Sequence, residues 1–99
     1  AVDKDGWTAL MIAAGNGEKE VCELLIEKGA DVNKVAGCGK TALIYAAQNG
    51  QKEVCELLIE KGADVNAVND NRSTALMLAA RSGHQEVCEL LIEKEMLMQ

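Results

Sequence analysis

Aromatic residues and proline are nearly missing from this sequence, because its 99 residues include one Trp, one Tyr, no Phe and no Pro. A hydrophobic core must therefore be built from aliphatic side chains. No apolar run approaches the roughly 18 residues that a membrane-spanning helix requires, and the N-terminus has neither the basic start nor the apolar stretch of a signal peptide. We expect one soluble domain, spanning residues 1–99, in the cytoplasm.

Basic residues are in the minority. The 10 Lys and Arg are interspersed among 16 Asp and Glu, which gives a formal net charge of −6. Phosphate binding needs basic side chains gathered on one face. The composition therefore argues against nucleic acid as a partner, and an anionic membrane surface would repel the chain in the same way.

Repetition dominates the sequence instead. Thr8, Thr41 and Thr74 each begin a Thr-Ala-Leu run, which sets a period of 33 residues. Residues 8–35 match residues 41–68 at 23 of 28 positions. Such agreement cannot arise by chance, so the chain consists of copies of one unit.

Each unit carries two short helical patterns. Thr8 is placed to cap a helix that runs through Ala14, and Gly17 closes this helix, since glycine adopts the left-handed conformation without a Cβ clash. A second helix, from about Glu18 to Lys28, is apolar on more than one side. Helices this short are marginal alone, so the pattern predicts an all-α solenoid in which each helix pair packs against the next.

The unit resembles the ankyrin repeat. The resemblance depends on the period, on Thr-Ala-Leu-Met-Ile-Ala-Ala at residues 8–14 and on Gly-Ala-Asp-Val-Asn at residues 29–33. It implies three L-shaped repeats joined by short β-hairpin-like loops, at about residues 3–35, 36–68 and 69–99. In this family the hairpin tips and first helices line a concave surface that binds proteins. The resemblance therefore implies a non-catalytic protein-interaction module.

Two features depart from the family pattern. The usual Thr-Pro-Leu-His is replaced by Thr-Ala-Leu followed by Met11, Ile44 or Met77, so the hydrogen bonds of that histidine are absent and we expect looser hairpins. Glu-Met-Leu-Met-Gln occupies residues 95–99, and neither end carries a polar capping repeat. Three explanations stay open: a fragment of a longer array, ends covered by self-association, or an engineered scaffold, although recent duplication would also give near-identical helices.

Residues that often carry chemistry occupy structural positions here. Cys22, Cys55 and Cys88 recur at the repeat period and are expected in the core. Cys38 lies between two glycines, as an exposed thiol that is either incidental or available for an intermolecular disulfide. No short Cys-x2-4-Cys pair offers a zinc site, and His84 has no evident nucleophile and acid to form a triad. The sequence therefore predicts no metal, no cofactor and no enzyme.

The recognition surface is predicted from the positions that face partners in ankyrin repeats. These hairpin-tip and first-helix positions are Lys4, Asp5, Trp7, Asn16, Cys38, Lys40, Tyr45, Gln48, Asn49, Asp70, Asn71, Ser73, Arg81 and Ser82. Trp7 is the expected energetic anchor, unless it only covers the first repeat. The Tyr45 hydroxyl either reaches the concave face or forms the wet tip of a packed ring. The expected partner is an unknown protein.

The rival hypothesis is a structural or self-assembling scaffold without a natural ligand. Its basis is the apolar C-terminal segment with Met96, Leu97 and Met98, which could extend the final helix and offer a patch to another copy.

Overall fold

Each repeat begins with a threonine that caps its first helix. In the computed structural model, which describes residues 8–97, the hydroxyls of Thr8, Thr41 and Thr74 accept the backbone N–H three residues later at 3.2, 3.3 and 3.3 Å. The helices that follow are α1 (Ala9–Gly15), α3 (Ala42–Gln48) and α5 (Ala75–Arg81). Such a cap stabilises a helix by about 1 kcal/mol, which is substantial for helices of only 7 residues. The predicted cap at Thr8 is confirmed.

A tight glycine turn joins each first helix to the second helix of the same repeat. Gly17, Gly50 and Gly83 have φ angles of 75°, 75° and 77°, the left-handed conformation that the sequence predicted for the turn. The second helices are α2 (Lys19–Glu27), α4 (Lys52–Glu60) and α6 (Gln85–Leu97).

Helix α6 is longer than α2 and α4. Those two helices are followed by Gly29 and Gly62, with φ angles of 100° and 99°. At the equivalent position the third repeat has Glu95, and α6 continues to Leu97. The predicted extension of the final helix is therefore confirmed as far as Leu97, whereas Met98 lies outside the described residues.

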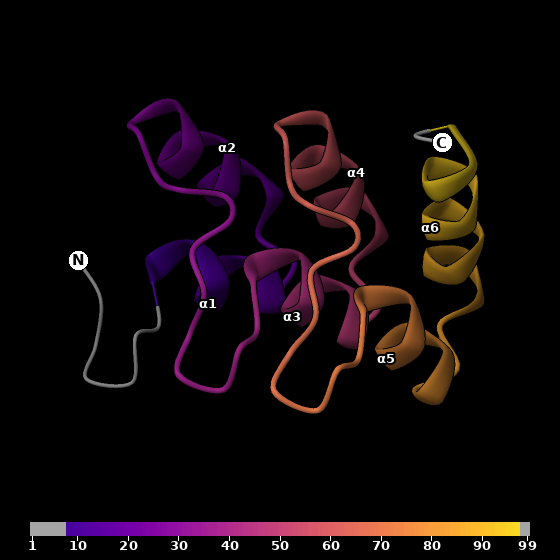
Figure 1. Cartoon of the computed structure of the whole chain (residues 1–99). Coiled ribbons are helices and arrows are strands. Elements are labelled where there is room, and N and C mark those ends of the chain that lie inside the picture. The colour runs from indigo at the N-terminus through magenta and orange to yellow at the C-terminus, as the bar shows by residue number, and fades with distance from the viewer. Residues whose placement is uncertain (1–7, 98–99) are drawn as a thin grey trace.

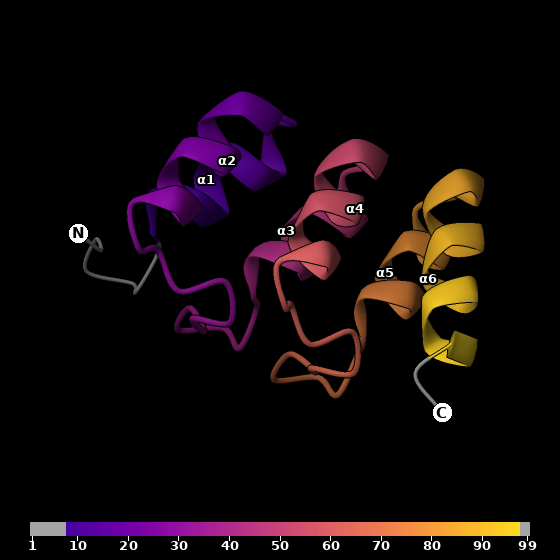
Figure 2. The same ribbon diagram turned by 90° about the horizontal axis from the view of Figure 1, so that it is seen from above.

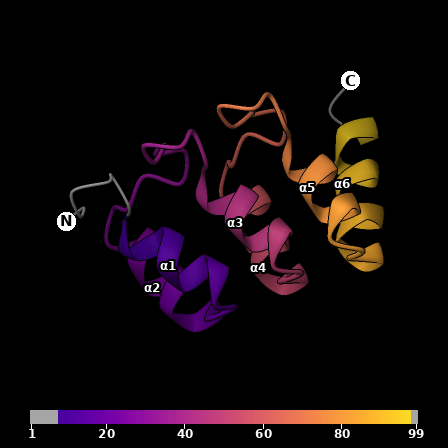
Figure 3. The same ribbon diagram turned by 90° about the horizontal axis from the view of Figure 1, so that it is seen from below.

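The helices form two layers. Helices α1, α3 and α5 pack side by side in one layer, α2, α4 and α6 form the other, and each helix contacts its partner in the same repeat (Figure 1). From above and from below, the three helix pairs follow one another along one direction (Figures 2 and 3). The described residues contain six helices and no strand, which confirms the all-α solenoid.

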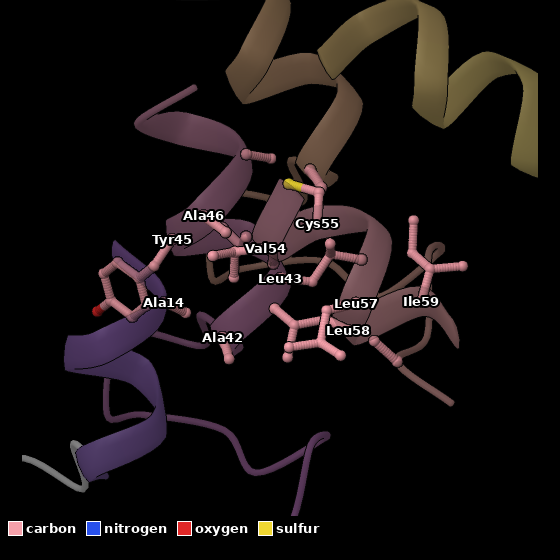
Figure 4. Packing of buried hydrophobic residues seen from close by; sticks show 14 of the residues in the cluster. Ala14, Ala42, Leu43, Tyr45, Ala46, Val54, Cys55, Leu57, Leu58 and Ile59 are labelled. Atoms are coloured by element: carbon pink, nitrogen blue, oxygen red, sulfur yellow. The ribbon is translucent and has the colours of Figure 1, made fainter. Parts of the chain in front are cut away.

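The middle repeat is buried on both sides. Residues 42–47 of α3 are each at most 8% exposed, and α4 buries five apolar side chains, including Val54 and Leu58 (Figure 4). Helix α2 has the same nine-residue sequence as α4 but buries only Cys22. Helix α6, with a repeat on one side only, buries three apolar side chains, so the apolar surface of the second helices is covered most completely where a repeat lies on each side.

The cysteines are all free. Cys22 and Cys55 are buried and Cys88 is half-buried at the last helix of the stack. Burial raises the pKa of the Cys22 thiol and raises that of Cys55 to about 12. The predicted core position is confirmed for Cys22 and Cys55, and Cys38 is exposed as expected.

Candidate protein-binding surface

Tip loop 1, residues 36–40, projects between α2 and α3 (Figure 1). The Ala36 N–H donates to the Lys40 carbonyl and the Gly39 N–H donates to the Ala36 carbonyl, both at 2.9 Å. Gly39 has a φ of 84°, which residues with a side chain rarely adopt. The loop is therefore a hairpin-like turn ordered by its own backbone, with Cys38 exposed at its tip.

Tip loop 2, residues 69–73, projects in the same way between α4 and α5. The Asn69 N–H donates to the Ser73 carbonyl at 3.0 Å, and the buried Asn69 Oδ1 accepts the N–H groups of Asn71 and Ser73, both at 2.9 Å. Asp70 and Asn71 are exposed, as a contact surface requires. Ser73 is only 7% exposed, so its side chain offers a partner little area.

The two tip loops contact each other. The Asp70 N–H donates to the Cys38 carbonyl at 3.1 Å. A Cβ atom on Gly39 would lie 2.7 Å from the Asp70 nitrogen, so this approach requires glycine. The loops are joined although the family histidine is absent, and the expectation of looser hairpins stays a prediction.

Four predicted binding residues meet between tip loop 1 and α3. The Tyr45 hydroxyl lies 3.3 Å from the Cys38 Sγ, and the Lys40 Nζ lies 5.4 Å from the centre of the Tyr45 ring. The same Nζ donates to the Gln48 Oε1 at 2.7 Å. We call Cys38, Lys40, Tyr45 and Gln48 the Tyr45 cluster, which joins a loop tip to the end of a first helix.

The position of Tyr45 combines the two alternatives that the sequence left open. Its side chain is only 8% exposed, and its ring extends toward α1 near Ala14 (Figure 4). Its hydroxyl nevertheless reaches the exposed residue Cys38. The ring is therefore part of the core, and the hydroxyl lies at the edge of the candidate surface.

The Tyr45 cluster also changes the chemistry of its thiol. The hydrogen bond with the Tyr45 hydroxyl lowers the pKa of Cys38 below its ordinary value, and Lys40 acts in the same direction. A lower pKa increases the thiolate fraction at neutral pH. Because Cys38 is also exposed, we expect its thiol to react more readily than the buried thiols of Cys22 and Cys55.

The remaining predicted residues with a described position lie at the ends of the first helices. Four are exposed, Asn16, Asn49, Arg81 and Ser82, and Gln48 is half-buried. The Asn49 amide donates to the Gly15 carbonyl at 2.9 Å, so part of its hydrogen-bonding capacity is used within the stack. Lys4, Asp5 and Trp7 lie outside the described residues and stay predictions.

Two side chains at the start of second helices connect neighbouring repeats. The Gln51 Nε2 donates to the Gly15 carbonyl at 3.2 Å, and the His84 Nε2 lies 3.0 Å from the Gln48 carbonyl oxygen. Because a carbonyl only accepts, this contact requires a hydrogen on Nε2. His84 is structural, as predicted. Sequence reasoning missed the bond of Gln51, because its partner lies 36 residues away.

Two further kinds of feature, a cluster of metal-binding side chains and a membrane-spanning helix, are absent from the described residues. Residues 8–97 contain no group of three His, Cys, Asp or Glu side chains arranged to hold a metal ion. Within the same range, no helix combines the length and the apolar character needed to cross a membrane.

Stacked helix pairs with projecting loops define a helical-repeat solenoid. A family model for ankyrin repeats in three copies matches residues 1–69 and again residues 34–98. The chain therefore belongs to the ankyrin repeat family, whose members generally bind proteins and are generally not enzymes. No curated protein matches the sequence.

Proposed function

We propose that this chain binds a protein partner through tip loops 1 and 2 and the exposed ends of α1, α3 and α5. The observation that supports this proposal is the contrast between framework and tips. Helices α2 and α4 are identical over nine residues, whereas tip loop 1 is Ala-Gly-Cys-Gly-Lys and tip loop 2 is Asn-Asp-Asn-Arg-Ser. Varied loops on a constant framework suit recognition.

The Tyr45 cluster is the proposed centre of this surface. It gathers a thiol, an ammonium, a phenol and an amide over two segments that are adjacent in the fold. Backbone hydrogen bonds already order both tip loops. Binding would therefore cost little conformational entropy of these loops. We expect a partner that forms hydrogen bonds to this polar edge.

Trp7, with Lys4 and Asp5, is proposed to extend the surface at the first repeat. A Trp7→Ala substitution should weaken binding by about 2 kcal/mol or more while leaving the thermal midpoint nearly unchanged. A large fall in the midpoint would instead assign Trp7 to the fold.

A photo-crosslinking experiment tests the proposed surface. A photoreactive amino acid is placed at Asn71 in tip loop 2, at Arg81 at the end of α5, or, as the matched control, at Glu53 on α4 of the middle repeat, and all three positions are exposed. Inside cells, the same partner should be captured from positions 71 and 81 and not from position 53. Capture from position 53 alone, or equally from all three, would contradict the proposal.

We also propose a reducing compartment, such as the cytoplasm, as the working environment. The support is that Cys38 is an exposed free thiol, and such thiols persist where glutathione keeps them reduced. A membrane-permeant maleimide applied to intact cells tests this proposal, since Cys38 should be labelled directly. If Cys38 is labelled only after a reductant is added, the proposal of a reducing compartment is contradicted.

A further inference from the structure

One end of the stack exposes apolar side chains whose counterparts are covered inside it. At the α1–α2 end, Ile12, Val21 and Leu24 are 51%, 46% and 53% exposed, and we call them the N-terminal end face. The residues at the same positions of the second repeat are at most 8% exposed, namely Tyr45, Val54 and Leu57. The N-terminal end face is therefore the kind of surface that a preceding repeat covers.

The opposite end carries the complementary surface. Met77 on α5 and Ile92 on α6 are 52% and 47% exposed, whereas their second-repeat counterparts Ile44 and Ile59 are 1% and 9% exposed. Met96 is 70% exposed one helical turn beyond Ile92. Met77, Ile92 and Met96 form the C-terminal end face, the kind of surface that a following repeat covers.

These two kinds of surface already meet twice within the molecule. Helix α3 packs between α1 and α5, and α4 packs between α2 and α6. At each contact the C-terminal side of one repeat covers the N-terminal side of the next, and the two end faces lie at opposite ends of the stack (Figure 1). The two end faces are thus equivalent to the two sides of the interface that joins neighbouring repeats within one molecule.

We propose that the chain binds a second copy of itself head to tail, with the C-terminal end face of one copy covering the N-terminal end face of the next. The new contact would repeat the packing of α3 on α5 and of α4 on α6. This inference does not depend on the proposed function, because the tip loops and the Tyr45 cluster lie along the side of the stack.

Charged residues on the second helices fit the same arrangement. Across the contact between the first two repeats, Lys61 lines one hollow with Glu23 and Glu27. The corresponding residues at the ends are Lys28 in the first repeat and the acidic residues Glu89 and Glu93 in the third. Opposite charges would meet across the new contact, which favours this orientation over others.

A head-to-tail contact uses a different surface on each partner, so it does not close at a dimer. The molar mass should therefore rise continuously with protein concentration. Sedimentation velocity of the 99-residue chain, with a reductant present to keep Cys38 free, measures this directly. A molar mass equal to that of the monomer at every concentration would overturn the proposal.

Two blocking substitutions identify the surfaces. Leu24→Lys charges the N-terminal end face and Ile92→Lys charges the C-terminal end face. Each variant alone should be monomeric, because loss of a central apolar interface residue weakens association by more than about tenfold. A 1:1 mixture should form a single species of twice the chain mass, since one intact face of each kind remains. A mixture that stays monomeric while the unmodified chain assembles would overturn the head-to-tail arrangement.

Val35→Lys is the matched control. Val35 is 53% exposed, like Leu24, but its counterpart Val68 in the next repeat is also exposed, at 47%. Stacking therefore does not cover this position, and the variant should assemble like the unmodified chain. Far-UV circular dichroism verifies that all three variants keep their helices.

A charge exchange tests the contact without altering the apolar faces. Lys28→Glu and Glu93→Lys should each weaken assembly, and the double variant should restore it in part. Equal assembly in all four proteins would show that the two charges do not meet, which would contradict the proposed register.

Discussion

Identical helices in different surroundings allow the stacking contribution to be measured. Leu24 and Leu57 occupy the same position of α2 and α4, which share one nine-residue sequence. Leu24 is 53% exposed and Leu57 is 6% exposed. Because helix propensity and local contacts are matched, the difference between Leu24→Ala and Leu57→Ala isolates the packing between repeats.

The expected magnitudes follow from burial. Complete burial of a leucine side chain is worth about 1.5–3 kcal/mol, and replacing a buried leucine by alanine also leaves a cavity, so that the total cost is about 2–5 kcal/mol. We expect Leu57→Ala to lower the free energy of unfolding by about 3 kcal/mol. Leu24→Ala removes a half-exposed side chain and leaves an opening to solvent, so about 1 kcal/mol or less is expected.

Urea unfolding followed by far-UV circular dichroism measures both free energies. The protein must be dilute, because head-to-tail association would cover Leu24 and raise its apparent contribution. An equal loss of stability in the two variants at low concentration would refute the reasoning, since it would mean that the neighbouring repeat contributes nothing at position 57.

Three further predictions concern the tip loops and the buried thiol. Gly39→Ala should destabilise the fold by more than about 1 kcal/mol, because the position has a positive φ and little space beside Asp70; an unchanged thermal midpoint would contradict this. Tyr45→Phe removes the hydroxyl that lowers the pKa of Cys38, so iodoacetamide should alkylate Cys38 more slowly at neutral pH, with an unchanged rate as the contrary result. Burial raises the Cys55 pKa to about 12, whereas an unfolded thiol ionises near pH 9. The stability that comes from keeping Cys55 neutral should therefore be complete below about pH 9 and be lost as the pH rises toward 12, and Cys55→Ala should lack this loss in pH-dependent unfolding.

The helices were predictable because their signals are local. A capping threonine bonds to a backbone N–H only three residues away, and a glycine ends a helix through its own φ angle. Both signals lie within one helical turn, so the roles of Thr8 and Gly17 could be assigned from the sequence alone. Burial was less predictable. Val21 and Val54 share one sequence context, yet they are 46% and 1% exposed, because burial depends on a neighbouring repeat rather than on adjacent residues.

The candidate site was predictable as a set of positions but not as an arrangement. The repeat register assigned Cys38, Tyr45 and Gln48 to one side of the stack. It did not predict that the Tyr45 ring is buried while its hydroxyl contacts Cys38, since this requires the path of the loop back to α3. Nor did it predict that Ser73 is buried and that its backbone N–H donates to the buried Asn69 Oδ1.

The two proposals together have a consequence for affinity. Recognition would use the side of the stack and assembly would use its ends, so a head-to-tail copy leaves every Tyr45 cluster uncovered. A partner with one binding site would then bind monomer and assembly equally, and by linkage it would not shift the assembly equilibrium. A partner with two sites would bind the second copy from an effective concentration set by the spacing of the repeats. Only such a partner gains affinity from assembly, and by the same linkage it would promote assembly in return.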